Sequence, residues 1–156
     1  WNCDQERGST RGSFHTTIAV LEGLAEFERR SGSDPAVSDA RASGEEYLLE
    51  RRLMRRLSTG EIVDSSFTRP AFPTWWRYDV LRGLDHLRRA GRAPDDRVGE
   101  ALDLIEAARA PVGRWRRQVI HTGDVHFDVD GGRDEPSRWI TLRALRVLRW
   151  AGRPTL

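Results

Sequence analysis

Side chains that commonly bind zinc occur in two parts of this sequence. Thiolate, imidazole and carboxylate groups are the ligands that zinc prefers in its tetrahedral sites. Near the N-terminus and around residue 124 they are Cys3, His15, His121, Asp124 and His126. Their spacing matches no local zinc signature, so two interpretations stay open: a zinc site, or a structural role with Cys3 as a small buried residue and His15 donating to a backbone carbonyl.

The sequence gives weaker support for catalytic motifs and for a calcium site. The sequence contains no Gly-x-Ser-x-Gly elbow, no phosphate-binding glycine loop and no helix with paired zinc histidines, so a catalytic activity stays uncertain. Asp128 and Asp130, ahead of Gly131 and Gly132, are similar to part of a calcium loop but lack the fifth and twelfth ligands. The alternation of polar and apolar residues over 123–130 also fits a short strand or hairpin.

The elements that would position these side chains come from a repeat. Three segments share the frame Leu-x-x-Leu-x-x-Leu/Phe, and the frames lie 60 and 61 residues apart: Leu21/Leu24/Phe27, Leu81/Leu84/Leu87 and Leu142/Leu145/Leu148. Apolar residues at this spacing predict a helix, and a glycine after each frame, at Gly32, Gly91 and Gly152, predicts a left-handed C-terminal cap. We therefore predict helices over 14–31, 76–91 and 138–152.

Two further amphipathic helices are predicted between these three, over 38–57 and 95–110. They open with Ser38 and Asp95, whose side chains can cap free backbone N–H groups. Long connections over 58–75 and 111–137 lead into the second and third repeated helices, and connections of this length are commonly functional. The predicted fold class is all-α, with helix-pair repeats about 60 residues long and one domain over 1–156.

Two sequence runs carry a resemblance to a known superfamily. Phe14-His15-Thr16-Thr17, followed by Leu21-Glu22-Gly23-Leu24, is similar to the Tyr-His-Thr…Leu-x-Gly-Leu segment of prenyltransferase β subunits, and Gly113-Arg114-Trp115 resembles the end of the squalene cyclase repeat. Over nearly its whole length the chain resembles the terpenoid cyclase and protein prenyltransferase α/α toroids, and bacterial squalene-cyclase-like proteins in particular. The resemblance implies a partial α/α toroid, with 14–31, 76–91 and 138–152 as inner helices and 38–57 and 95–110 as outer helices.

The resemblance also implies a site. In such a toroid the starts of the inner helices and the long loops lie on one rim of a central cavity, which would bind an apolar or isoprenoid-like small molecule. The candidate cavity residues are His15, Trp76, Tyr78, Asp79, Arg138 and Trp139. Their aromatic faces would stabilise cations or, equally, pack between helix layers. His15 takes the place of a zinc ligand, whereas the family's Asp and Cys ligands would precede Trp1 and its Asp-x-Asp-Asp acid motif is absent.

Two alternative functions remain at this stage. One is a non-catalytic helical-repeat module for oligomerisation or partner binding, and the other is a zinc-dependent enzyme that uses a rim site at Cys3 and His15. Half a toroid leaves an inner face open, so we expect residues preceding Trp1, or a second copy, to cover it.

Composition narrows the classes of partner. All 26 basic residues are arginine, the net charge is only +2, and the arginines alternate with acids, which predicts solvated helix faces and no nucleic-acid partner. No apolar run approaches the roughly 20 residues of a transmembrane helix. A single cysteine fits a reducing compartment, so we expect a cytoplasmic protein.

Overall fold

The computed structural model describes residues 1–155 and is built from helices. The five α-helices are α1 (Phe14–Ser31), α2 (Pro35–Glu50), α3 (Val80–Arg89), α4 (Gly99–Ala107) and α5 (Arg138–Trp150). Three 3-10 turns accompany them, η1 (Gln5–Arg7), η2 (Ser65–Thr68) and η3 (Asp96–Val98). Within residues 1–155 the only β pairing is isolated bridges, so the all-α prediction is confirmed for this part of the chain.

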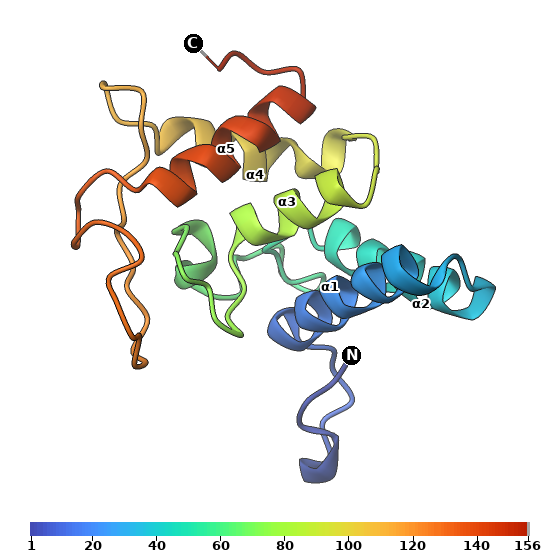
Figure 1. Ribbon diagram of the computed structural model, residues 1–156. Helices are drawn as coiled ribbons and strands as arrows, with labels where there is room; N and C mark the ends of the chain where they lie inside the picture. Colours follow the sequence, from blue (N-terminus) through green and yellow to red (C-terminus); the bar gives the residue numbers. More distant parts are fainter. Residues whose placement is uncertain (156) are drawn as a thin grey trace.

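The helices form two layers with α3 at the centre of one of them. α3 packs against α1 on one side and α5 on the other, while α2 packs on α1 and α4 packs on both α3 and α5. Figure 1 shows α1, α3 and α5 towards the viewer, with α2 behind α1 and α4 behind α5. The three repeated helices are therefore neighbours in one layer, and the two intervening helices lie behind them.

The hydrophobic core lies between these layers. Leu81, Leu84 and Leu87 of α3 are all buried, as the central position of this helix requires. Trp115 is also buried, and its indole N–H donates to the carbonyl of Ile105 over 2.6 Å. Satisfying the indole in this way lets a large ring fill the space beside α4 without an unpaired polar atom.

Side-chain caps set where α2 and α3 begin, and they correct two predicted boundaries. Asp79 accepts a hydrogen bond from the backbone N–H of Arg82, so α3 begins at Val80 and not at residue 76. Asp34 caps the second helix, with Pro35 in its first turn, so this helix begins before the predicted Ser38. The stretch predicted over 95–110 is a 3-10 turn followed by the shorter α4.

The second helix also ends seven residues earlier than predicted. Arg52 and Leu53 follow α2 with φ angles of 45° and 65°, a left-handed backbone that ends the helical hydrogen bonding. Leu57, the last residue of the predicted helix, lies outside α2 and is exposed. By contrast, Gly91 and Gly152 have φ angles of 73° and 69°, as the repeat predicts, whereas Gly32 combines a φ of 86° with a ψ of 174° and is not a left-handed cap.

The long connection before α5 contains no strand. Among residues 111–137 the backbone pairs only at isolated positions, so the predicted hairpin over 123–130 is wrong. Asp130 is buried and accepts from the Ser137 hydroxyl and from the Arg138 backbone N–H. It anchors the start of α5, and this structural role replaces the calcium hypothesis.

No helix described in residues 1–155 combines the length and the apolar character needed to cross a bilayer.

Candidate functional site

The predicted zinc ligands do not assemble into a metal site. Among residues 1–155 no three His, Cys, Asp or Glu side chains are arranged to hold an ion. Cys3 is exposed, contrary to its interpretation as a small buried residue, and hydrogen bonds with Thr16 and Ser13 lower the pKa of its thiol. Asp124 and His126 lie exposed in the long connection, so a zinc enzyme built on this set is not supported by the geometry.

Three of the predicted cavity residues do lie together at the start of α1. The Nδ1 atom of His15 accepts a hydrogen bond of 2.8 Å from the backbone N–H of Tyr78, so His15 is an acceptor here and not the donor that the structural interpretation predicts. The ring of Trp76 meets the His15 ring edge-on at 5.1 Å. The accepted bond fixes the imidazole proton on Nε2, and the cluster links α1 to the segment that leads into α3.

The environment of His15 predicts its protonation state. Burial lowers the pKa of the imidazole, the charges of Arg77 and Arg82 lower it further, and Asp64 opposes them. His121 lies near enough to experience the same effects, with burial first and then Arg77 and His15 lowering its pKa. Both rings are therefore neutral at neutral pH.

We expect an NMR titration to give a His15 pKa below the ordinary value of about 6.5. Because the folded pKa is lower than the unfolded one, the stability that neutral His15 contributes is complete above about pH 6.5 and is lost as the pH falls through the folded pKa. His15→Ala assigns the resonance, and a titration at or above 6.5 would contradict this placement.

The remaining predicted cavity residues have separate positions. Asp79 is buried at the start of α3, where its second carboxylate oxygen accepts from the Ala71 N–H, and burial raises the pKa of this carboxyl against the charge of Arg143. Arg138 and Trp139 lie in the first turn of α5, and both donate to the carbonyl of Val129. Of these three residues, Trp139 lines a cavity between α3 and α5.

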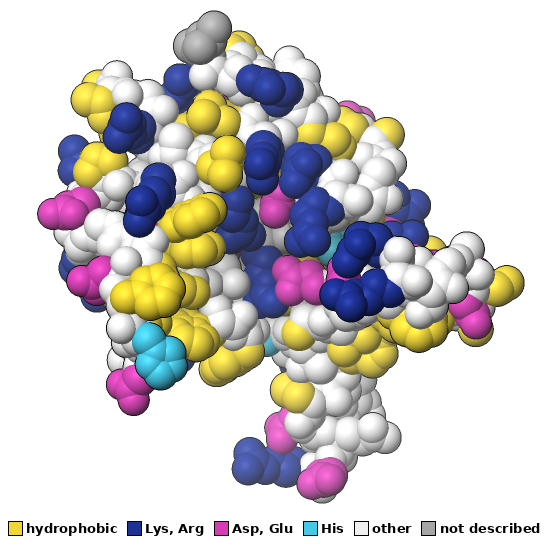
Figure 2. All heavy atoms as spheres, in the orientation of Figure 1, with side chains coloured by type: hydrophobic (Ala, Val, Ile, Leu, Met, Phe, Trp, Pro, Cys, Tyr) yellow, Lys and Arg dark blue, Asp and Glu magenta, His cyan; other side chains and the backbone are white. Residues whose placement is uncertain are grey.

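That cavity is a groove of about 370 Å³ formed mainly by α3 and α5, which we call the α3–α5 groove. Its apolar side consists of Phe72, Trp139 and Leu142, and the rings of Phe72 and Trp139 are stacked with centroids 5.4 Å apart. Its polar side carries five arginines and two acids: Arg82, Arg88, Arg89, Arg143, Arg146, Glu22 and Asp85. Figure 2 shows basic side chains gathered over α3, with hydrophobic side chains towards the start of α5.

The acids neutralise only part of this positive charge. Glu22 pairs with Arg82 over 2.6 Å, and Asp85 pairs with Arg88 over 2.9 Å and with Arg143 over 3.6 Å. Arg89 and Arg146 are exposed and have no ion pair with any residue in 1–155. The groove therefore presents two uncompensated guanidinium groups next to a stacked aromatic surface.

Comparisons with family models, curated proteins and solved structures find no match to this chain. Its chemistry is therefore argued from its own side chains.

The sequence analysis did not predict the charged residues of this groove, although they recur at helical spacing. Positions 82, 85 and 89 share one face of α3, and 139, 142, 143 and 146 share one face of α5. The arginines were predicted to lie on solvated helix faces, because a helix with alternating charges is usually exposed. Only the packing of α3 against α5 turns these two faces towards the same space.

A buried polar cluster beside the groove was missed as well. His86 of α3 and Glu45 of α2 have side chains only 3% exposed, and His86 Nε2 lies 3.2 Å from the Glu45 carboxylate. The second carboxylate oxygen accepts from Arg92 over 2.5 Å. His86 lines another cavity of about 440 Å³, which shares Glu22, Arg88 and Arg89 with the α3–α5 groove.

Proposed function

We propose that this protein binds a small amphipathic molecule, with an apolar isoprenoid-like part and an acidic head group, in the α3–α5 groove. The observation that carries the proposal is the stacked Phe72 and Trp139 pair beside Arg89 and Arg146, which have no ion pair within residues 1–155. Apolar walls bury a hydrocarbon chain, and guanidinium groups bind phosphate or carboxylate with directed hydrogen bonds. The volume of about 370 Å³ is in the range of small-molecule sites.

The proposal includes a larger α/α toroid in which α1, α3 and α5 would belong to the inner layer. The support is the spacing of 60 and 61 residues between the repeated frames, together with the placement of these helices in one layer. Phe27 of α1, one of the two helices that flank α3, is 48% exposed and does not line the α3–α5 groove. Further helix pairs would cover such positions.

The test compares three ligands by calorimetry: a prenyl phosphate, the matching prenyl alcohol and inorganic phosphate. We expect the prenyl phosphate to bind at least about tenfold more tightly than either of the others, because only it uses both sides of the groove. Trp139→Ala and Arg146→Glu should each weaken this binding about tenfold, since each removes one side.

Arg149→Glu is the matched control, because Arg149 is exposed on the same helix and is not among the residues that line the groove. Equal affinity for the three ligands, or equal losses in Arg146→Glu and Arg149→Glu, would overturn the proposal. A ligand-free dimer detected by light scattering, in which Phe27 and Leu142 become protected from solvent, would instead favour the assembly function predicted as the alternative.

A further inference from the structure

A separate cavity lies between α2, the segment before α1 and the turn after α2. Its volume is about 410 Å³, and it shares no lining residue with the α3–α5 groove. Four arginines line it, Arg11, Arg51, Arg55 and Arg56, and among the described lining residues none is acidic. We call it the Tyr47 cavity after the aromatic ring in its wall.

The Tyr47 ring is held in place from three sides. Its hydroxyl donates to the carbonyl of Gly12 over 2.7 Å, and the ring of Phe14 meets it edge-on at 5.6 Å. A Cβ atom at residue 12 would lie only 2.8 Å from the Tyr47 ring, so Gly12 allows the segment before α1 to approach this closely. These contacts fix the position of the Tyr47 ring in the wall of the cavity.

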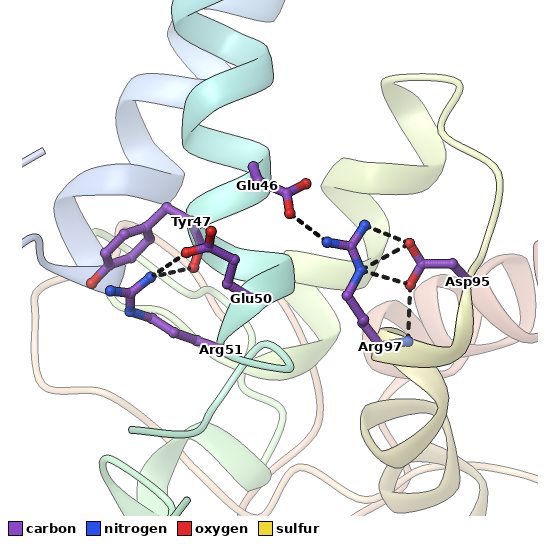
Figure 3. Close-up of polar contacts among 6 residues, drawn as sticks. All are labelled: Glu46, Tyr47, Glu50, Arg51, Asp95 and Arg97. Atoms are coloured by element: carbon purple, nitrogen blue, oxygen red, sulfur yellow. Dashed lines mark hydrogen bonds and ion pairs between the residues drawn. The ribbon is translucent and has the colours of Figure 1, made fainter. Parts of the chain in front are cut away.

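The arginines around this wall are also fixed, but not all are neutralised. Arg51 lies 3.8 Å from the Tyr47 ring centroid and donates to the Tyr47 carbonyl over 3.0 Å, while its nearest acid, Glu50, is 3.5 Å away and half exposed (Figure 3). Arg56 donates to the Val63 carbonyl over 3.2 Å. Within residues 1–155 neither Arg11 nor Arg56 has an ion pair, whereas Arg55 is fully engaged by Glu100.

The backbone that places Arg55 and Arg56 is strained. Arg52 and Leu53 are successive non-glycine residues with positive φ, a conformation that costs about 1–2 kcal/mol per residue. A hydrogen bond stabilises this turn, because the Leu53 carbonyl accepts from the buried Tyr78 hydroxyl over 2.7 Å. Its effect is to bring Arg55 and Arg56 to the same cavity as Arg51.

We propose that the Tyr47 cavity binds a small organic phosphate, whose apolar part packs on Tyr47 and Val63 and whose phosphate group binds Arg51 and Arg56. A dianion matches the excess positive charge, and guanidinium groups held by backbone carbonyls keep further N–H donors for phosphate oxygens. This site is independent of the function proposed for the α3–α5 groove.

The probe is phenyl phosphate, titrated into ¹⁵N-labelled protein and followed by NMR, with inorganic phosphate as the comparison. We expect shift changes at the amides of Gly12, Tyr47 and Val63, and an affinity at least about tenfold higher for phenyl phosphate because inorganic phosphate leaves the aromatic wall unused. Shift changes confined to α3 and α5 would overturn this proposal and leave the groove proposal standing.

The variants Arg51→Glu and Arg56→Gln should each weaken phenyl phosphate binding at least about tenfold. Arg114→Glu, a change at an exposed arginine that does not line the cavity, is the control for net charge and should bind as the wild type does. Thermal unfolding establishes that each variant is folded, and the wild-type shift map decides the question if one is not. Unchanged affinity in both variants, or an equal loss in the control, would reject the site.

Discussion

Replacing Glu45 by alanine is expected to lower the free energy of unfolding by about 2–4 kcal/mol. The Glu45 carboxylate is buried between α2 and α3, where it contacts His86 Nε2 at 3.2 Å and Arg92 Nε at 2.5 Å. Removing it leaves the buried His86 ring without this partner and Arg92 without its counter-ion. Urea unfolding measures the loss.

The adjacent residue provides a matched control. Glu46 also belongs to α2 and pairs with Arg97 over 2.5 Å, but its side chain is 49% exposed (Figure 3). Exposed ion pairs contribute little, so Glu46→Ala should change the stability by less than about 1 kcal/mol. Similar losses in the two variants would show that burial does not govern the Glu45 interactions.

The same carboxylate predicts a pH dependence. Burial is the largest influence and by itself raises the pKa of Glu45, but hydrogen bonds from His86 and Arg92 outweigh it, so the pKa is lowered. Its stabilisation is therefore present above the unfolded value of about 4.3 and is lost as the pH falls through the folded pKa. The stability difference between wild type and Glu45→Ala should shrink on acidification below pH 4.3, and a difference that grows there would contradict this sign.

The repeat in the sequence predicts the helices well because it reports a local property. Apolar residues at helical spacing with a terminal glycine favour one amphipathic helix whatever its neighbours are. The predicted helix over 14–31 has the same bounds as α1. The starts of α2 and α3 were misplaced because several residues compete as caps, and which side chain reaches a free N–H group depends on the preceding turn.

The burial of the repeat could not be predicted from the same pattern. Equivalent positions Phe27, Leu87 and Leu148 carry similar apolar side chains, yet Phe27 is exposed while Leu87 and Leu148 are buried. Leu87 lies on α3, which has partners on both sides of its layer, but α1 and α5 each pack against two helices, so the number of neighbours does not separate Phe27 from Leu148. Sequence spacing identifies an apolar face and contains no information on what covers it.

The candidate site shows the same limit. Sequence reasoning selected aromatic and histidine residues because their chemistry is distinctive, and it treated the abundant arginines as surface. Arg82 is one of the arginines left out in this way, although it is buried and joins three segments of the chain. An arginine whose partners lie up to 60 residues away has no local signature.

Replacing Arg82 by alanine is expected to destabilise the protein by about 3 kcal/mol. Its guanidinium binds the Glu22 carboxylate through Nε and Nη2, at 3.0 and 2.6 Å, and donates through Nη1 to the carbonyls of Trp75 and Arg77. The substitution removes the ion pair between α1 and α3 and frees two carbonyls of the segment that leads into α3. Urea unfolding and faster amide exchange over residues 74–77 would report both losses.

Two companion variants separate geometry from charge. Arg82→Lys keeps the charge but lacks the planar fork that reaches both Glu22 and the carbonyls, so it should recover less than half of the lost stability. Arg88→Ala removes a side chain that is 26% exposed, against 8% for Arg82. Its partner Asp85 lies on the same helix and keeps its pair with Arg143, so this variant should cost less than about 1 kcal/mol. A lysine variant as stable as the wild type would show that the fork geometry is not required.

A second readout of Arg82→Ala lies at the start of α1. The Arg82 charge is one of the influences that lower the pKa of His15, so its removal should move that pKa upward towards about 6.5. The shift distinguishes a local electrostatic contact from general destabilisation, because a merely looser fold changes the exchange rates without a defined change in the histidine titration. An unchanged His15 pKa in a folded Arg82→Ala protein would separate the His15 cluster from the α3–α5 groove, whereas an upward shift would show that the charge of Arg82, in the wall of that groove, is electrostatically coupled to His15.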